Sequence, residues 1–279
     1  MAQAESVSAE WDSTAYDVLA KPEVEWGKKV LDRLHLQGFE KVLDAGCGTG
    51  RVTAMLCERL PHGHVIAVDL SDNMLNVARE HLKGVSGRVK FVQADLVNLS
   101  LQEEVDGIFS TAAIHWISDH WKLFGGFYRA LRPGGWLVAQ CGAAPNLARL
   151  RRRAAELVYE GMFSVYFRDW TDPWMFVEHT TMAERLRLVG FENVKTTQVP
   201  AYSCMPNREM YKQYISTVTL RKHVAQMPAE IAQKFLNVLA DMAEHDTPKF
   251  EMDYWRLNMS AVKPANTAAV NSNLASTSN

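Results

Sequence analysis

The most chemically informative residues form a glycine-rich run behind a short apolar segment. Residues 42–50 read Val-Leu-Asp-Ala-Gly-Cys-Gly-Thr-Gly, and helical periodicity begins directly afterwards. Glycines in such a loop let the backbone turn sharply and approach a ligand closely. The third glycine, Gly50, comes one residue too early for the dinucleotide fingerprint G-x-G-x-x-G, which needs glycine where Arg51 stands. The run also lacks the G-K-[ST] lysine of a nucleoside triphosphate site.

Three acidic residues end three successive strand-like runs. A carboxylate at Asp44 repels a pyrophosphate and suits a ligand that carries an ammonium group. Asp69 can accept two hydrogen bonds from a ribose diol. Asp95, between Ala94 and Leu96, suits the edge and face of an amino-purine. Each residue taken alone also suits a helix cap, but open α/β sheets bind ligands at strand carboxyl ends, so we expect the three side chains together.

Strand-like and helical segments alternate along the first half of the chain. The strand-like runs are 41–45, 65–69, 89–95, 105–111 and 136–141, and the helical ones are 49–60, 72–81 and 119–131. This alternation predicts right-handed βαβ units and a parallel sheet. Later helices are expected at 146–162, 181–189, 206–224 and 228–245. Later strands are expected at 194–199 and 252–262, with an aromatic-rich loop or short helix at 169–176.

The bulk composition excludes several classes of function. The 279 residues are 47% hydrophobic and 22% charged, with a net charge of −2, which is ordinary for a globular protein and gives no positive field for nucleic acid. The arginines at 149 and 151–153 suit a solvated helix face or, alternatively, contact with an anionic substrate. A polar N-terminus and the lack of any apolar run near ~20 residues predict no membrane association and a cytoplasmic location.

The cysteines are not arranged for disulfides or for a metal. They are Cys47, Cys57, Cys141 and Cys204, and no two form a C-x-x-C pair. We expect reduced thiols and no metal site.

The motifs resemble those of class I S-adenosylmethionine-dependent methyltransferases over residues 38–142. Residues 44–50 resemble the first motif of that family, 68–69 its ribose motif, 94–96 its adenine motif, and 129–135 the turn before its fifth strand. The resemblance implies S-adenosyl-L-methionine as cofactor. It also implies a doubly wound α/β fold, in which a seven-stranded, mostly parallel, Rossmann-like sheet has an antiparallel last strand and carries a helical cap.

A resemblance to the trans-aconitate and small-acid O-methyltransferases rests on three segments. They are Trp11 to Tyr16, residues 113–120 and residues 254–258. The implied organisation has four parts: N-terminal lid helices over 1–37, the cofactor-binding core over 38–145, the rest of the sheet with a substrate cap over 146–263, and a disordered tail over 264–279. The implied cofactor contacts are Tyr16, Asp44, Gly46, Cys47, Gly48, Thr49, Gly50, Asp69, Leu70, Met74, Ala94, Asp95, Leu96 and Thr111.

His115 is the first candidate for a catalytic residue, because it follows the carboxyl end of the fourth predicted strand. We expect it to position the acceptor, and proton abstraction is the more demanding hypothesis. The alternative is a structural role, in which His115 caps the next helix or packs against Trp116. Aromatic residues at high density either pack a core or wall an apolar pocket. The candidate substrate contacts are Trp11, Trp116, Tyr166, Trp170 and Trp174.

The function expected is methyl transfer to a small molecule by a monomer or homodimer. The acceptor atom expected is a carboxylate or hydroxyl oxygen, and the alternative is a carbon or nitrogen methyltransferase of secondary metabolism. A nicotinamide-dependent oxidoreductase is disfavoured by Asp44 and by the early third glycine. A non-catalytic binding module is the remaining alternative.

Overall fold

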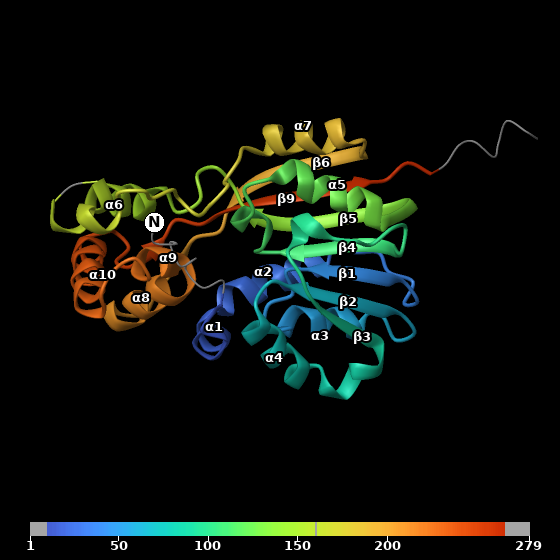
Figure 1. Cartoon of the computed structure of the whole chain (residues 1–279), viewed down its shortest axis with the longest axis horizontal. Helices are drawn as coiled ribbons and strands as arrows, with labels where there is room; N and C mark the ends of the chain where they lie inside the picture. The colour runs from blue at the N-terminus through green and yellow to red at the C-terminus, as the bar shows by residue number, and fades with distance from the viewer. Residues whose placement is uncertain (1–9, 160, 266–279) are drawn as a thin grey trace, which may run out of the picture.

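A seven-stranded sheet forms the centre of the molecule in the order β3-β2-β1-β4-β5-β9-β6 (Figure 1). The computed structural model describes residues 10–159 and 161–265, so parts of the expected lid and tail lie outside the described residues. The strands are β1 (Lys41–Ala45), β2 (His64–Asp69), β3 (Val89–Gln93), β4 (Val105–Thr111), β5 (Leu131–Gly142), β6 (Glu192–Pro200) and β9 (Trp255–Val262). Strand β9 runs antiparallel to β5 and β6 and the others run parallel, which confirms the predicted sheet.

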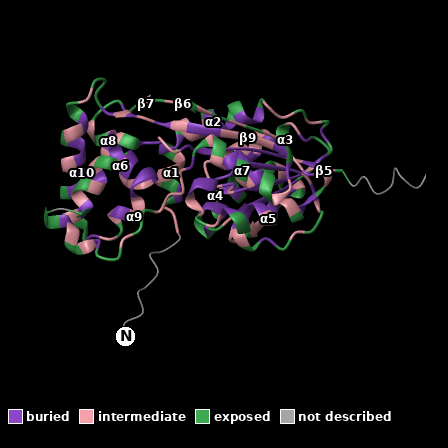
Figure 2. Ribbon diagram, turned by 90° about the horizontal axis from the view of Figure 1, so that it is seen from above, coloured by how far each residue is buried: buried purple, intermediate pink, exposed green. Residues whose placement is uncertain are grey.

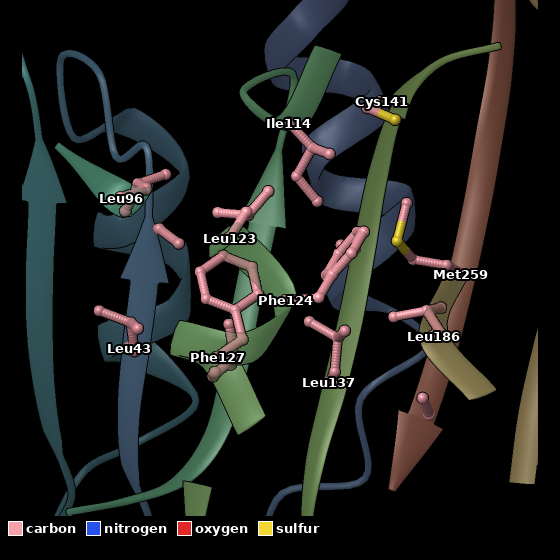
Figure 3. Close-up of a cluster of buried hydrophobic side chains, with 14 of the residues drawn as sticks. Leu43, Leu96, Ile114, Leu123, Phe124, Phe127, Leu137, Cys141, Leu186 and Met259 are labelled. Carbon is pink, nitrogen blue, oxygen red and sulfur yellow. The ribbon is translucent and has the colours of Figure 1, made fainter. Parts of the chain in front are cut away.

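The central strands are apolar because both faces of the sheet are covered by helices. One face packs on α2 (Lys21–Leu31), α3 (Arg51–Glu58) and α4 (Asp72–His81). The other packs on α5 (His120–Ala130) and α7 (His179–Val189), where the rings of Phe124 and Phe127 fill the space above β4 and β5 (Figure 3). The sheet is therefore doubly wound.

Local sequence explains where several of these helices begin and end. The Ser71 hydroxyl accepts the backbone N–H of Met74 and caps α4, and Asp119 caps α5 in the same way. Pro22 lies in the first turn of α2, where its missing N–H costs nothing. Helix α7 ends at Gly190, which has a left-handed backbone.

A helical cap with its own hydrophobic core lies beside the carboxyl edge of the sheet (Figures 1 and 2). The core draws on both halves of the chain, since it includes Leu19 and Trp26 as well as the later helices. The cap helices are α6 (Ala148–Tyr159), α8 (Arg208–Tyr214), α9 (Arg221–Val224) and α10 (Ala229–Glu244), with the short strands β7 (Ser203–Cys204) and β8 (Glu251–Met252). Helix α1 (Ser13–Leu19) reaches from the sheet domain toward this cap.

Three elements differ from the sequence prediction. A π-helical segment, Ile215–Thr219, breaks the helix expected over 206–224. The last strand is interrupted at residues 253–254, where Asp253 accepts the backbone N–H of Arg149 and so ties the strand to α6. Strand β5 begins at Leu131, before the Pro-Gly-Gly turn, because Leu131 pairs with Val105 of β4.

Candidate active site

Three adjoining cavities lie at the carboxyl edge of the sheet. The largest, about 410 Å³, runs past the ends of β2, β3 and β4. A second, about 60 Å³, lies behind the glycine loop. A third, about 40 Å³, lies between the sheet and the cap. Tyr16 and Ala112 line all three, so a ligand in one cavity can meet a ligand in another at this junction.

The glycine loop leaves open space where a ligand can approach the backbone. Gly46, Gly48 and Gly50 all have positive φ, which glycine adopts without strain. No atom lies within 4 Å of the position that a Cβ at Gly48 would occupy, and Gly48 lines the two larger cavities. A Cβ at Gly46 would instead lie 2.3 Å from the Cβ of Ala113. Gly48 is therefore the residue at which the loop leaves room for a ligand.

Asp69 at the end of β2 joins the loop to the largest cavity. Its Oδ2 accepts the backbone N–H of Gly48 at 2.9 Å, and its Oδ1 accepts that of Ser71 at 3.0 Å. Burial raises the pKa of the carboxyl, although both hydrogen bonds favour its ionised form. The carboxylate is thus held at the cavity wall as a hydrogen-bond acceptor.

The end of β3 supplies the far wall of the largest cavity. Asp95 accepts the backbone N–H of Val97 at 3.1 Å and begins the short helix η2 (Leu96–Asn98). The other predicted contacts that line this cavity are Leu70, Met74, Ala94, Leu96 and Thr111. Mostly apolar side chains therefore surround a half-buried carboxylate, an arrangement that suits a purine ring.

The small cavity behind the loop is acidic. Asp44 is buried and accepts a 2.7 Å hydrogen bond from the hydroxyl of Thr53, while burial raises the pKa of its carboxyl to about 7. Cys47 and Thr49 line the same cavity. Gly50 does not: a Cβ there would meet Ala78, so its role is to let α3 pack on α4.

The N-terminal segment lies over the largest cavity and is held at several points. Trp11 packs edge-on against Tyr16, with ring centroids 5.2 Å apart, and against Trp116 at 5.6 Å. The guanidinium of Arg221 lies 4.0 Å from the centroid of the Trp11 ring. The Ser71 hydroxyl donates to the carboxylate of Glu10 at 2.8 Å, and the first backbone N–H groups of α4 also point to it. One N-terminal segment therefore covers the largest cavity and also lines the third through Trp11.

His115 is buried in the wall of the third cavity. The backbone N–H of Gly142 donates to its Nδ1 at 3.3 Å, and its ring stacks on Phe176 at 5.3 Å. Burial, followed by the nearby charge of Arg256, holds the pKa of the imidazole well below its usual range. The ring is therefore neutral and carries its proton on Nε2, which makes His115 a hydrogen-bond donor.

Arg256 of β9 brings a buried positive charge to the same cavity. Its side chain is 3% exposed, its Nε donates to Oε1 of Gln140 at 3.3 Å, and its guanidinium lies 4.4 Å from the ring centroid of Trp26. Gln140 in turn donates to Asn258, which also accepts from Arg33. In the part of the chain that the structure describes, no carboxylate lies within 4 Å of the Arg256 guanidinium.

Glu23 lines both the small acidic cavity and the third cavity. Its Oε1 accepts the hydroxyl of Tyr214 at 2.6 Å, and that hydroxyl also lies 2.6 Å from the hydroxyl of Tyr254. Its Oε2 is buried without a hydrogen-bond partner among the described residues. Burial raises the pKa of the Glu23 carboxyl.

The structure does not bring all predicted substrate contacts together. Trp11, Trp116 and Trp174 line the third cavity. Tyr166 and Trp170 do not line any of the three cavities; they pack against the core of the cap, and Trp170 contacts Phe167 and His223. This corrects the sequence prediction for these two residues, whose rings serve the cap's own hydrophobic core.

Arg256 and Glu23 were not among the predicted site residues. In the sequence, Arg256 alternates with apolar residues along a strand, which is typical of a solvent-facing position. Helix α2 covers that face and buries it, and α2 also carries Glu23. The signal in the sequence was the tryptophan of α2 together with a strand whose second face is polar.

Two expected absences concern metals and membranes. Among the described residues, no cluster of three or more His, Cys, Asp or Glu side chains is placed to hold a metal ion, and the four cysteines are unpaired thiols. Over the same residues, no helix has the length and apolarity that crossing a lipid bilayer demands.

The chain is similar to known methyltransferases in sequence. Residues 42–135 match a family described as a methyltransferase domain. The trans-aconitate 2-methyltransferase of Methylobacterium nodulans is 31% identical over 183 residues, which cover 60% of this chain and 67% of that protein. The enzyme of the same name from Azoarcus sp. is 38% identical over 130 residues, 47% of this chain, so the match spans about half of that relative's length.

Solved structures of methyltransferases share the fold. Phosphoethanolamine N-methyltransferase 2 of Haemonchus contortus, in complex with S-adenosylhomocysteine, is 20% identical with a TM-score of 0.60, over 90% of this chain and 57% of that one. A protein of Bacillus halodurans described as a candidate methyltransferase is 20% identical with a TM-score of 0.60, over 86% of this chain and 99% of that one.

Proposed function

The chain belongs to the class I S-adenosylmethionine-dependent methyltransferases, in the group of the trans-aconitate methyltransferases, and on this premise we propose that it methylates a carboxylate oxygen of a small molecule. The cofactor, when bound, supplies a methyl group already activated on a sulfonium. The protein then has to align the acceptor and exclude water. The observation that carries the choice of acceptor is the buried guanidinium of Arg256 in the third cavity.

The residues at the strand ends fit the cofactor. The space at Gly48 admits a ligand against the backbone, and Asp69 accepts hydrogen bonds from ribose hydroxyls. Asp95, with its apolar neighbours, suits an adenine edge. Asp44, in the cavity behind the loop, suits the ammonium group of the methionine arm.

His115 and Arg256 suit a carboxylate acceptor in complementary ways. Arg256 attracts and orients the anion, and the Nε2–H of His115 donates a hydrogen bond toward the same cavity. A carboxylate is ionised at neutral pH and needs no general base. A neutral donor is therefore the form of His115 that this reaction requires, and we assign it a positioning role.

Glu23 supports a second candidate, which is methylation of a hydroxyl oxygen. Glu23 lines the third cavity, which we call the acceptor cavity, and its buried Oε2 has no hydrogen-bond partner among the described residues. The raised pKa of its carboxyl suits a group that takes a proton. A carbon or nitrogen acceptor that must lose a proton would use the same group. Because Glu23 also lines the cavity behind the glycine loop, its role for a carboxylate acceptor is to hold the cofactor's ammonium group.

The experiment that separates these acceptors uses product chemistry. The purified protein is incubated with S-adenosylmethionine and a panel of paired acids and alcohols, and products are identified by mass spectrometry. A methyl ester releases methanol in alkali, whereas ethers, amines and C-methyl products are stable. We expect alkali-labile products; stable products formed only from alcohols or amines would overturn the proposal.

The variant Glu23→Gln distinguishes the two roles of this side chain. For a carboxylate acceptor we expect a higher KM for the cofactor and little change in kcat. For a hydroxyl acceptor, kcat falls instead, and its rise with pH disappears. Glu25→Gln, on the same helix and outside the cavities, is the matched control.

A further inference from the structure

The acceptor cavity holds a guanidinium that forms no ion pair within 4 Å among the described residues, although Glu23 is its acidic neighbour in the same cavity. Arg256 is almost completely buried, and a buried charge is costly unless it is paired. Gln140 accepts a hydrogen bond from its Nε–H alone, and the ring of Trp26 covers one face of the guanidinium. The other guanidinium N–H groups find no acceptor within the described part of the chain, so they are free for an anion in the cavity that Arg256 lines.

Flat rings form one wall of this cavity. His115 stacks on Phe176 with an interplanar angle of 22°, and Phe176 stacks on Trp174 at 17° with ring centroids 5.8 Å apart. Trp116 and Trp11 continue the wall toward the largest cavity, which they also line. Such a wall favours a planar, apolar group and offers few donors to a polar one.

The cavity is small and carries one full positive charge. A water-sized atom needs about 10–15 Å³ of cavity volume. The volume of this cavity is about 40 Å³, which leaves room for roughly three heavy atoms, the size of a carboxylate. Among the described residues lining it, Arg256 is the single Lys or Arg, and Glu23 is an acid. A second carboxylate would find no second Lys or Arg among these residues, only Glu23, the aromatic rings and uncharged polar groups such as Asn146 and Thr219. Arg221 and Lys222 line the largest cavity instead.

We propose that the acceptor is a monocarboxylic acid with a planar, apolar body, and that Arg256 is the residue that selects it. This inference rests on the proposed carboxylate methylation. The carboxylate occupies the small cavity beside Arg256, and the body extends past Trp116 and Trp11 into the largest cavity, which these two rings also line. The carboxylate oxygen forms a bond to the methyl carbon as the bond from that carbon to the sulfonium sulfur breaks, and the sulfur keeps the electron pair. The acid thereby loses its charge, so the neutral ester binds Arg256 more weakly than the acid did.

The test compares acids that differ in charge and body. The probes are an aryl-propenoic acid, a medium-chain 2-alkenoic acid, the tricarboxylate trans-aconitate, and the alcohol that matches the aryl acid. We expect kcat/KM for the two monocarboxylic acids to exceed that for trans-aconitate by about 100-fold. Faster methylation of trans-aconitate would overturn this inference and leave the proposed function intact. Methylation of the alcohol alone would overturn the proposed function itself.

Variants of Arg256 test the selecting residue. Arg256→Met should lower kcat/KM for the monocarboxylic acids by about 100-fold, the scale for losing a buried charged hydrogen bond, and leave S-adenosylhomocysteine affinity within about twofold. Arg256→Lys should recover part of the loss. Arg132→Met, exposed on β5 and paired with Asp106, is the matched control.

A second variant tests the same assignment if Arg256→Met fails to fold. Gln140→Leu removes the acceptor of the Arg256 Nε–H, so the guanidinium can turn away from the cavity. This variant should raise KM for the acid without raising KM for the cofactor. Unchanged acid kinetics in folded Arg256→Met or in Gln140→Leu would overturn the assignment.

Discussion

The backbone N–H of Gly142 donates to Nδ1 of His115, and this bond decides which ring nitrogen carries the proton. Gly142 is the last residue of β5, so the sheet itself sets the tautomer. With Nδ1 occupied as an acceptor, the neutral imidazole presents only an N–H to the acceptor cavity. A histidine held in this way orients a substrate oxygen and is a poor base.

The first prediction is that kcat with a carboxylic acid is independent of pH between about pH 6 and pH 8. The acid is already ionised and His115 stays neutral across this range, because burial lowers its pKa. His115→Phe should lower kcat by about 10-fold, the scale of one lost hydrogen bond, without changing the shape of the profile. Steady-state rates at saturating cofactor measure this. A tenfold rise in kcat per pH unit that disappears in His115→Phe would instead identify a base.

The second prediction concerns the pH dependence of cofactor binding. Burial raises the pKa of Asp44 to about 7, so below that pH the free protein carries a neutral carboxyl there. An ammonium ligand requires the ionised form, and therefore affinity for S-adenosylhomocysteine should rise between pH 5.5 and pH 7, by at most about tenfold per pH unit. Calorimetry at the two pH values measures the change. Asp44→Asn should bind weakly and equally at both, and a wild-type affinity that does not vary would argue against the role.

The third prediction compares two glycines of one loop. Gly48→Ala places a methyl group in open cavity space, at a strain cost of about 1–2 kcal/mol for its left-handed backbone. We expect a folded protein that no longer binds S-adenosylhomocysteine. In Gly46→Ala the new methyl group would lie against Ala113, so thermal stability should fall as well. Melting curves with and without ligand separate the two, and normal ligand stabilisation of Gly48→Ala would contradict the assignment.

The fourth prediction is that Asp69→Asn weakens cofactor binding by about 1–3 kcal/mol, the scale for a lost partner of a buried polar group. In the wild type, both carboxylate oxygens of Asp69 accept a backbone N–H, one from Gly48 and one from Ser71. The amide has the same size, but only one of its two terminal atoms can accept a hydrogen bond. Isothermal titration with S-adenosylhomocysteine measures the loss. Glu80→Gln on the exposed side of α4 controls for the change of charge, and equal affinities in the two variants would remove Asp69 from the site.

The fifth prediction concerns stability in acid. Burial lowers the pKa of His223 to about 4, below the value of about 6.5 in an unfolded chain. The unfolded state therefore binds the proton first, so this contribution to stability is present above pH 6.5 and is lost as pH falls toward 4. The loss amounts to about 3 kcal/mol for this residue. Urea unfolding at pH 7.5 and pH 4.5 should show a smaller difference for His223→Phe than for the wild type; an equal difference would contradict it.

The sheet and the residues gathered at its carboxyl edge could be predicted because their signals are local. The strand-loop-helix around Gly46 and the acidic residues at strand ends are each visible within about ten residues of sequence. The carboxyl ends of parallel strands meet at one edge, so topology alone brings Asp44, Asp69 and Asp95 together.

The acceptor cavity could not be predicted in the same way, since its walls come from distant segments. Arg256 is adjacent to Trp26 only because α2 packs across β9, and these residues are 230 positions apart. Trp170 and Trp174 are equally aromatic and four residues apart, yet one packs in the cap and the other lines the cavity. Aromatic content predicts that a ring is buried, but it does not predict whether the ring packs in a core or lines a cavity.

The position of β9 has a consequence for how the enzyme is made. It is the last strand of the sheet in chain order but lies between β5 and β6, not at an edge. During synthesis, therefore, β5 and β6 leave the ribosome before the strand that joins them, and Arg256 arrives with that strand. A nascent chain can form the cofactor side of the pocket early, while selection of the acceptor has to wait until β9 has been synthesised.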